Sequence, residues 1–409
     1  MRNCPMMEFP LDEYEVRMAN LVAKIQQAEC DAVLLTNEEN LRYFCDYRSA
    51  AWSSEYEYPA MMVVTKAGDA ALLTSVRRRP TAEETCCLEP EQIFAYEGFG
   101  HQASPEAFVP AVVDALKRLG TVSGKLGTET GVASRMRITY RDYENLFAAL
   151  PGMQAMDFAG YIFDLREIKS PREIEVMRKC CGIAVEGFRV AMDQLKLGET
   201  TEEEMYHTYT AACFDMGADD MEYILIVEFG PDRPQPNCMA GARVYENADW
   251  CVFLDSGPSL KGYVTDIIRI GKLSKPTKAQ EDFYKISLDC HRACIAMVKP
   301  GVKIGDLCKA HDDFMRAHGV EEICLTMNNS GHGVGLDVHE MPIIKSAFAD
   351  KEFRPGMVFA FEPTIIHSTE GQIVLENNYL VTETGCENLT AALQDIYVPQ
   401  RSEPITSCK

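Results

Sequence analysis

The stretch of sequence that decides the fold is Val252-Phe-Leu-Asp-Ser-Gly-Pro-Ser-Leu-Lys-Gly-Tyr-Val-Thr-Asp-Ile-Ile-Arg269. It contains two apolar runs typical of β-strands, separated by a turn rich in glycine from Gly257 to Gly262. Asp255 and Asp266 lie eleven positions apart, one on each run. A hairpin with this turn can bring both carboxylates to one point. Taken alone, two aspartates at strand ends are more often solvated turn residues.

Three later phrases add one imidazole and two further carboxylates: Gly331-His332-Gly333, Phe361-Glu362-Pro363 and Leu375-Glu376-Asn377. A lone histidine is more often structural, but the glycines around His332 let the backbone approach other groups closely. Glu362 and Glu376 lie on apolar, β-rich runs, where an unpaired carboxylate is costly. Four carboxylates in one pocket repel one another unless cations are present. The pattern therefore predicts a site for two divalent ions.

These phrases, in this order, resemble the creatinase/prolidase/methionine aminopeptidase family, whose shared C-terminal domain has the pita-bread fold. The resemblance covers residues 165–390 closely and the N-terminal part loosely, in the manner of the two-domain Xaa-Pro peptidases and creatinase. It implies an α/β creatinase-like domain with a mixed sheet over residues 1–164. Residues 165–409 would form the catalytic domain, an α+β pita-bread fold with a curved antiparallel sheet.

The coarse pattern of the chain agrees with this layout. In the first part, short β-rich runs alternate with helical stretches, which favours an α/β domain with a mixed sheet. Residues 164–174 form the expected boundary, where Ser170 is a candidate N-cap, Pro171 the first helical residue and Glu173 the capping-box partner. Beyond it, a pair of helices, a set of strands, a second pair of helices and a second set of strands are predicted.

The resemblance also implies roles for individual residues. The ligands of two divalent ions (manganese, cobalt, iron or zinc, with manganese favoured for an oxygen-rich site) would be Asp255, Asp266, His332, Glu362 and Glu376. In this family a hydroxide between the ions attacks the substrate carbonyl, and Glu362 would pass the proton to the leaving nitrogen. His339 would contact the substrate and stabilise the tetrahedral intermediate. Arg269 is expected to support the site from behind the ligands, with a surface salt bridge as its alternative.

Three further residues are candidates for the substrate pocket: Asn237, His367 and Trp52. Trp52 belongs to an aromatic stretch that begins at Tyr43 and includes Tyr56 and Tyr58. In the family's two-domain members, the N-terminal domain of one subunit commonly closes the active site of the other, which implies a homodimer here. Ordinary core aromatics are an equally good interpretation of this stretch.

Three positions depart from the pattern of the proline peptidases. Asn237 and Asn328 stand where these enzymes often have histidines, and Val374 stands where an arginine is common. Asparagine can still hydrogen-bond a carbonyl group, but it cannot carry a proton or a positive charge. Because of these replacements, the sequence does not decide whether the substrate is a proline peptide.

Three functions are therefore compatible with the sequence. The first is a dinuclear metallohydrolase, namely a Xaa-Pro dipeptidase or aminopeptidase acting on small peptides. The second is an enzyme of the same fold that acts on a small non-peptide metabolite, by creatinase-like or ectoine-hydrolase-like C–N cleavage. A C–S lyase fits less well, because Gly257 stands where that relative has an extra aspartate. The third, a non-catalytic binding protein, is least favoured because all five ligands are present.

Charge and composition narrow the classes of partner. The 409 residues have a formal net charge of −22, which argues against nucleic acid or anionic membranes as partners, since both require a basic surface. No run of apolar residues is long enough for a signal peptide or a membrane span, so a cytoplasmic protein is expected. The 16 cysteines show no disulfide framework and are expected to be reduced.

Overall fold

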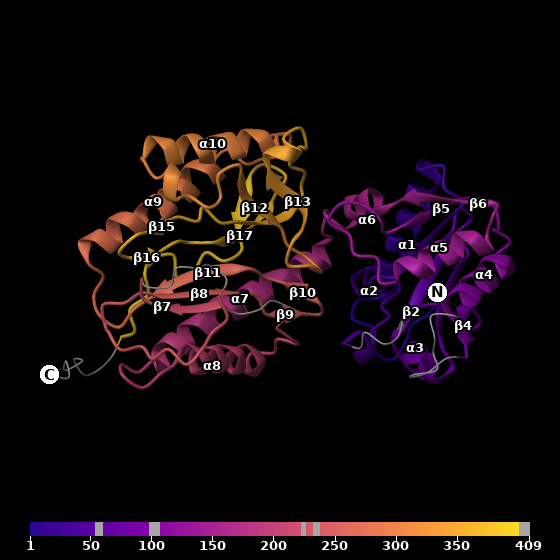
Figure 1. Ribbon diagram of the computed structural model, residues 1–409, viewed down its shortest axis with the longest axis horizontal. Coiled ribbons are helices and arrows are strands. Elements are labelled where there is room, and N and C mark those ends of the chain that lie inside the picture. The colour runs from indigo at the N-terminus through magenta and orange to yellow at the C-terminus, as the bar shows by residue number, and fades with distance from the viewer. Residues whose placement is uncertain (54–59, 98–106, 222–225, 232–237, 401–409) are drawn as a thin grey trace. The chain divides into compact units, whose positions relative to one another are not determined.

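The computed structural model describes residues 1–53, 60–97, 107–221, 226–231 and 238–400. The chain divides into two compact units, Met1–Leu165 and Arg166–Lys409 (Figure 1). Within the described ranges, no helix is both long enough and apolar enough to cross a bilayer. Fifteen described cysteines are free thiols, and thirteen of these are buried, as expected for small apolar side chains.

The N-terminal unit is built on a six-stranded sheet with the order β4-β3-β2-β1-β5-β6. Its strands are β1 (Ala32–Leu35), β2 (Ala60–Thr65), β3 (Ala70–Ser75), β4 (Ile93–Tyr96), β5 (Gly124–Thr128) and β6 (Met153–Asp157). β2 pairs antiparallel with both β1 and β3, whereas the β1–β5, β3–β4 and β5–β6 pairs are parallel. The predicted mixed sheet is confirmed.

Six helices of this unit surround the sheet: α1 (Leu11–Gln27), α2 (Glu38–Cys45), α3 (Arg79–Thr85), α4 (Phe108–Arg118), α5 (Tyr140–Ala149) and α6 (Ala159–Arg166), the last of which ends just past the unit boundary. Alternate strand residues such as Leu34 and Val63 point to one face, where they share an apolar core with Val112 and Leu116 of α4. Asn37 caps α2 by accepting a hydrogen bond from the amide of Glu39.

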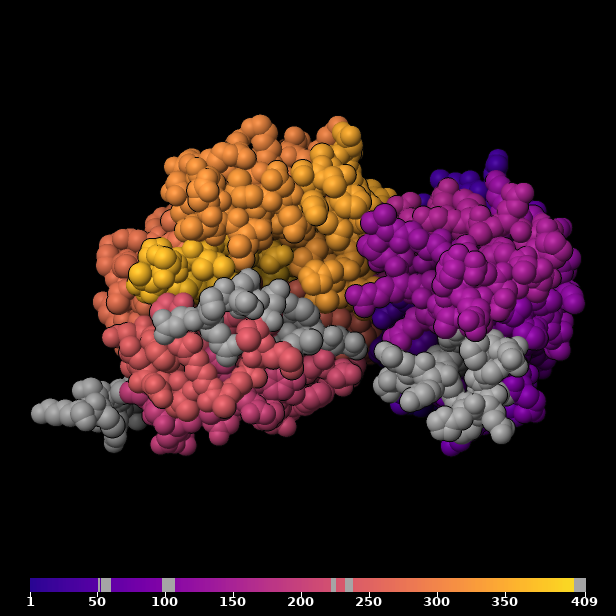
Figure 2. All heavy atoms as spheres, viewed as in Figure 1, coloured from indigo at the N-terminus to yellow at the C-terminus, as the bar shows by residue number. Residues whose placement is uncertain are grey.

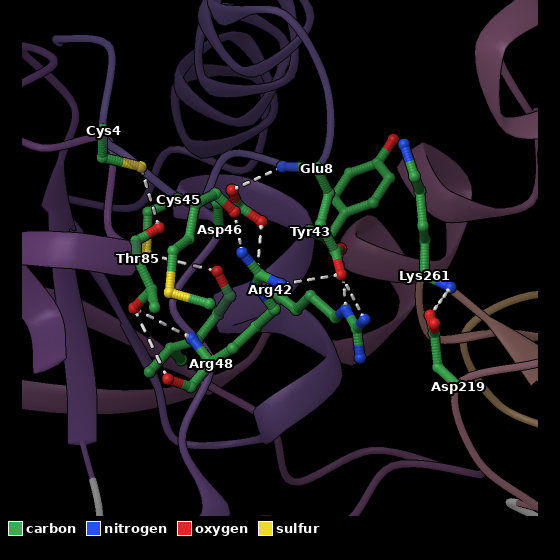
Figure 3. A network of polar contacts seen from close by, with 12 residues as sticks. Cys4, Glu8, Arg42, Tyr43, Cys45, Asp46, Arg48, Thr85, Asp219 and Lys261 are labelled. Carbon is green, nitrogen blue, oxygen red and sulfur yellow. Dashed lines mark hydrogen bonds and ion pairs between the residues drawn. The ribbon is translucent and has the colours of Figure 1, made fainter.

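A network of ion pairs fastens the N-terminal tail to the end of α2 (Figure 3). Glu8 accepts hydrogen bonds from Arg42 Nε at 3.0 Å and from Arg48 Nη1 at 3.1 Å. The amide of Glu8 in turn donates to Asp46 Oδ2 at 3.0 Å. Burial raises the pKa of Asp46 to about 6, although Arg48 opposes the shift. This network fixes the start of the segment that leads to Trp52.

The C-terminal unit contains two pairs of helices. These are α7 (Pro171–Gln194), α8 (Glu202–Asp215), α9 (Lys278–Ile295) and α10 (Ile304–Ala317). Helix α7 begins as predicted: Ser170 Oγ accepts from the amide of Glu173 at 3.2 Å, and the Glu173 carboxylate accepts from the amide of Ser170 at 2.7 Å.

Two antiparallel sheets lie between these helix pairs. The first has the order β11-β8-β7, and the second has the order β13-β12-β14-β17-β18. Their strands are β7 (Ile226–Phe229), β8 (Val252–Ser256), β11 (Ile267–Gly271), β12 (Asn329–Gly333), β13 (Glu340–Lys345), β14 (Val358–Phe361), β17 (Asn377–Val381) and β18 (Cys386–Asn388). Two short hairpins add β9 (Ser259–Leu260) with β10 (Tyr263–Val264), and β15 (Ile366–His367) with β16 (Gly371–Gln372).

The two sheets meet where β11 lies beside the residue that precedes β17. There the amide of Glu376 donates to the carbonyl of Ile268 at 3.3 Å. The predicted α+β domain with antiparallel strands is confirmed, although the expected curved sheet is divided into these two hydrogen-bonded parts. This contact joins the segment that carries Asp266 to the segment that carries Glu376.

The helix pairs cover opposite faces of the three-stranded sheet. Phe188 of α7 packs with Val227 and Leu254 on one face, whereas Phe253 and Ile268 share a core with α9 and α10 on the other. In the space-filling view, the orange segment with α9 and α10 and the pink segment with α8 lie on opposite sides of this unit (Figure 2). The strands therefore form the middle layer.

Candidate metal centre

The pleat of the strands explains why the predicted ligands converge. Side chains of directly paired residues point to the same face of a sheet, and so do residues two apart on one strand. Asp255 pairs with Ile268 of β11, and Asp266 lies two residues before Ile268. In the five-stranded sheet, His332 pairs with Ala360, which lies two residues before Glu362.

Glu376 reaches the same face by the same rule. Asn378 of β17 pairs with Ala360, and Glu376 precedes Asn378 by two residues. Ala360 therefore lies between the strands that carry His332 and Asn378. The sheet register thus places all five predicted ligands at the junction of the two sheets.

The distances confirm that these side chains are close together. Within each of three overlapping groups, candidate ligand atoms lie within 4.8 Å of one another: Asp255 with Asp266 and Glu376, His332 with Glu362 and Glu376, and Asp266 with His332 and His339. His332 Nε2 lies 3.6 Å from Asp266 Oδ2 and 3.7 Å from Glu362 Oε1. The five residues predicted as ligands therefore form one cluster, with His339 at its edge.

His332 presents a lone pair to the cluster. Its Nδ1 lies 3.2 Å from the carbonyl oxygen of Gly333, which can only accept a hydrogen bond, so Nδ1 carries the proton. Burial lowers the pKa of His332 to about 3, and His339 adds to this effect. The ring is neutral near pH 7, and its unprotonated Nε2 faces Asp266 and Glu362. This is the arrangement of a histidine that binds a metal ion.

The carboxylates of the cluster are electrostatically unfavourable without a cation. Burial, followed by the charges of Glu376 and Asp255, raises the pKa of Asp266 well above its usual range. Burial, Glu362 and Asp255 raise that of Glu376 in the same way. Burial and Asp255 raise the pKa of Glu362 to about 8. These shifts arise because low-dielectric surroundings and neighbouring acids both disfavour the ionised form.

The donor set fits divalent cations. Asp266 Oδ1 and Glu376 Oε1 are buried and accept no hydrogen bond from the part of the chain that the structure describes. Buried carboxylate oxygens of this kind are costly unless a partner is supplied. Carboxylates with a single neutral imidazole suit a hard divalent ion.

Arg269, predicted to support the site from behind the ligands, binds chain groups next to Glu376. It is buried and donates to the carbonyl oxygen of Glu376 at 2.6 Å and to Asn377 Oδ1 at 3.0 Å. The same guanidinium donates to the carbonyl oxygen of Thr390 at 2.6 Å. A surface salt bridge is therefore excluded as its role, because the side chain is only 1% exposed.

Asn378 is a supporting residue that the sequence interpretation missed. Its Oδ1 accepts from the amide of Asp266 at 3.2 Å and from Thr265 Oγ1 at 2.6 Å, and its Nδ2 donates to the carbonyl oxygen of Asp266. The side chain thereby holds the peptide groups on both sides of the Asp266 Cα atom. The signal was present in the sequence, since an asparagine two residues after Glu376 in an apolar run needs buried partners.

Helix α9 fixes the residue next to Glu376. His291 Nε2 donates to the carbonyl oxygen of Leu375 at 2.8 Å, its Nδ1 accepts from Tyr379 at 2.8 Å, and the amide of Leu375 donates to Ser287 Oγ at 3.1 Å. Burial lowers the pKa of His291 to about 3, so the ring is neutral. This histidine is structural, and it orients the strand that bears the ligand.

Among the described pocket candidates, His367 is not in any of the candidate ligand groups. Asn237, Tyr56 and Tyr58 lie outside the described residues. Trp52 belongs to the N-terminal unit, where it is 5% exposed and its ring centroid lies 6.4 Å from that of Tyr47. His367 on β15 packs its ring against Phe283 at 4.9 Å.

Two of the positions that depart from the peptidase pattern also have defined surroundings. Val374 is fully buried in the apolar core with α9 and α10. Asn328 has a positive φ of 64°, and its amide donates to Asp312 Oδ1 at 3.1 Å.

Comparison with known proteins agrees with the fold and the cluster. Residues 17–168 match the Creatinase/Prolidase N-terminal domain, and residues 175–383 match Metallopeptidase family M24. The Uncharacterized peptidase YqhT of Bacillus subtilis is 25% identical over 91% of this chain and 97% of its own length. The Xaa-Pro dipeptidase of Pyrococcus furiosus is 28% identical over 58% of this chain and 66% of its own length.

Solved structures show the same fold. A Xaa-Pro dipeptidase from Bacillus anthracis superposes with a TM-score of 0.79 at 24% identity, covering 94% of this chain and 99% of the other. An X-Pro aminopeptidase from Thermotoga maritima gives 0.78 at 22% identity, covering 93% and 99%. Because the peptidase family matches half of the chain and spans the whole acidic cluster, this chain belongs to metallopeptidase family M24.

Proposed function

We propose that this chain is a dinuclear metal-dependent hydrolase that cleaves an amide bond, as a Xaa-Pro dipeptidase or aminopeptidase. The observation that supports this proposal most strongly is the buried cluster centred on Glu376, which belongs to two of the candidate ligand groups. Its Oε1 accepts no hydrogen bond from the described residues. The relatives named Xaa-Pro dipeptidase support the choice of substrate.

Two of the candidate ligand groups include Glu376, and each of these groups would hold one ion. Asp255 and Asp266 belong to one group, and His332 and Glu362 belong to the other. Two such ions, when bound, activate water and polarise a carbonyl oxygen. Manganese is the favoured ion because the donors are mostly hard carboxylate oxygens.

Glu362 and His339 are the residues proposed to act on the substrate. The Glu362 side chain is 25% exposed, whereas that of Asp266 is 4% exposed, so a substrate can reach Glu362. A carboxylate at this position can accept a proton from water and return it to the leaving nitrogen. His339 lies at the exposed edge of the cluster. Partial burial of its ring lowers its pKa, although Asp337 opposes the shift. A neutral imidazole N–H can donate to the oxygen of the reacting carbonyl.

A small non-peptide metabolite is the second candidate substrate. Val374 is fully buried among apolar residues, so this position offers no charge to a substrate carboxylate. This favours C–N cleavage in a molecule without a terminal proline carboxylate, ahead of a C–S lyase or a non-catalytic binding protein. We also propose that the protein is a cytoplasmic homodimer, which rests on the family resemblance alone.

An activity panel on the manganese-loaded protein tests the proposal. Xaa-Pro dipeptides and tripeptides would be assayed beside creatine, ectoine and dimethylsulfoniopropionate, with Glu362→Gln as the control. Turnover of proline peptides that disappears in Glu362→Gln is the expected result. Turnover of a metabolite alone would replace the peptidase by the second candidate, and no turnover with two ions bound would contradict both.

A further inference from the structure

A group of buried charges lies directly beside His339. The carboxylate of Glu340 accepts from Lys169 Nζ at 2.7 Å and from Arg166 Nη2 at 2.6 Å. The side chains of Lys169, Glu340 and Arg166 are 0%, 2% and 3% exposed. Burial alone would raise the pKa of Glu340, but Lys169 and Arg166 lower it below its usual value. The three side chains form a charged triad inside the C-terminal unit.

Stability alone is a poor reason for such a triad. Removing charges from water costs several kcal/mol per ion, and well-packed apolar residues of similar volume are often at least as stable. Buried ion pairs are better explained where they fix one arrangement of the chain among several. The question is therefore which segment the triad of Arg166, Lys169 and Glu340 holds in place.

The segment from Gly335 to Glu340 folds around the Glu340 carboxylate. Arg166 Nη2 also donates to Asp337 Oδ2 at 2.8 Å, and the amide of Asp337 donates to Glu340 Oε2 at 3.4 Å. A Cβ atom on Gly335 would lie 2.2 Å from Glu340 Oε1, so only glycine leaves room for the carboxylate there. The amide of Gly335 donates to the carbonyl oxygen of Asp337 at 3.1 Å, which closes the turn.

His339 is exposed, whereas its neighbours in residues 335–340 are held by hydrogen bonds. Its ring centroid lies 4.1 Å from that of His332, and its ligand atom lies within 4.8 Å of those of Asp266 and His332. Asp337 and Glu340, which flank His339, both bind Arg166. The backbone on either side of His339 is thus held by one guanidinium.

We propose that Glu340, held by Arg166 and Lys169, is a positioning residue that fixes the imidazole of His339 over the metal centre. The inference rests on the proposed function in one respect, which is that His339 contacts the substrate. Glu340 is in none of the candidate ligand groups. It acts on the reaction through the conformation of residues 335–340.

A double-mutant cycle tests the coupling between Glu340 and His339. The four proteins are the full-length wild type, Glu340→Gln, His339→Ala and the double variant, each loaded with manganese and assayed for kcat and KM on a Xaa-Pro dipeptide. We expect Glu340→Gln to lower kcat about 10- to 100-fold in the wild type, with the bound metal unchanged. In the His339→Ala background it should change kcat less than about 2-fold, because the group that it positions is gone.

Equal losses in both backgrounds would overturn the proposal and leave Glu340 a purely structural residue. Glu387→Gln is the matched control, because it removes one carboxylate from an exposed ion pair with Arg178 in the same unit. If Glu340→Gln does not fold, Asp337→Asn replaces it, since Asp337 is 37% exposed and its side chain pairs with Arg166. Because the Asp337 charge also raises the pKa of His339, kcat is then compared at a pH where His339 is neutral in both proteins. The expected result is then a smaller loss with the same dependence on His339.

A readout without substrate separates this inference from the proposed function. In zinc-loaded protein with 13C-labelled histidine, the His339 ring signal is assigned by its absence in His339→Ala. Glu340→Gln should shift or broaden that signal and leave those of the exposed His318 and of His207 unchanged. An unchanged His339 signal overturns the positioning role. A moved signal in a protein that cleaves no peptide supports the positioning role and contradicts the proposed function.

Discussion

Two groups of buried carboxylates lie in the C-terminal unit, and their surroundings differ sharply. In the first group, Glu340 is paired with Arg166 and Lys169, and the buried Glu167 is paired with Lys351 and Arg354. In the second group, the four acids of the candidate metal centre gather around His332, which is neutral. The pKa of Glu340 is lowered, whereas those of Asp266 and Glu376 are raised.

The difference teaches how the two groups are stabilised. The first is complete within the protein, because each carboxylate has a side-chain cation at hydrogen-bonding distance. In the second, Arg269 lowers the pKa of Glu376 somewhat, but its guanidinium donates to main-chain carbonyls and to Asn377. We propose that cations from solution neutralise this second group. Removing an acid from the two groups should therefore have opposite consequences.

The largest effect is expected at a proposed ligand. Asp266→Ala removes a carboxylate that contacts two of the three candidate ligand groups. We expect bound metal to fall and kcat/KM to drop about 1000-fold or more, as for other single losses of essential groups. Metal analysis and peptide kinetics on the same preparation measure both quantities. Full metal occupancy in Asp266→Ala would show that the cluster is not the metal centre.

Glu340→Gln should reduce stability as well as kcat. It leaves Arg166 and Lys169 buried without a counter-charge, which costs about 3–5 kcal/mol when one partner of a buried pair is removed. Urea unfolding should give this loss with and without metal, because the triad is independent of the ions. A loss that appears only in the metal-loaded protein would contradict the distinction between the two groups.

Asn378→Ala should weaken metal binding without abolishing it. The side chain holds the amide and the carbonyl of Asp266, so its removal frees the ligand rather than deleting it. Loss of such a supporting residue costs about 10- to 100-fold in metal affinity. Competition with a metal chelator measures the change. Asn388→Ala, on the next strand, is a comparison that leaves Asp266 untouched.

The metal-free protein should lose stability as the pH rises from 7 to 9. A carboxyl with a raised folded pKa stabilises the protein fully below its unfolded pKa, and this contribution is lost as pH rises through the folded pKa, which is about 8 for Glu362. The slope is about 1.4 kcal/mol per pH unit for each proton released. Neutral His332 and His291 act oppositely only below about pH 6.5, so they do not affect this window.

Bound metal should abolish this pH dependence. The ions keep the carboxylates ionised in the folded state, so no proton is released between pH 7 and 9. Glu340, whose pKa is lowered, contributes stability that is lost only as pH falls through its folded pKa. Thermal unfolding at several pH values, with and without manganese, compares the two cases. A flat metal-free profile would contradict the raised pKa values.

The cluster of candidate ligands was predictable from the sequence because its acids lie in apolar, β-rich runs. Asp266, Glu362 and Glu376 each stand where a carboxylate is costly, and this anomaly is visible without coordinates. The mixed and antiparallel sheets followed from the order of helical and β-rich runs. The supporting residues were not predictable in the same way. Asn378 and His291 act through main-chain groups that only the register of β17 and α9 brings to them.

The triad was missed for a different reason. Arg166 and Lys169 stand in a polar stretch before α7 that looks solvated in the sequence, and their partner lies more than 170 residues away. The sequence around each of these residues does not indicate an ion pair with a residue so far along the chain. Gly335 was visible as part of the glycine-rich phrase, but its need for glycine comes from Glu340 Oε1 and not from the metal centre.

The measurement that tests the account most directly is the thermal stability of Glu376→Gln in two metal states. Without metal at pH 7, the raised pKa of Glu376 means that folding must protonate this carboxyl group, and Glu376→Gln removes that cost, so we expect Tm to rise by about 2–4 °C for each kcal/mol relieved. With manganese, the same substitution removes a ligand, so Tm should fall relative to the loaded wild type. A fall in both states, as expected at Glu340, would contradict the claim that this cluster is built to hold cations.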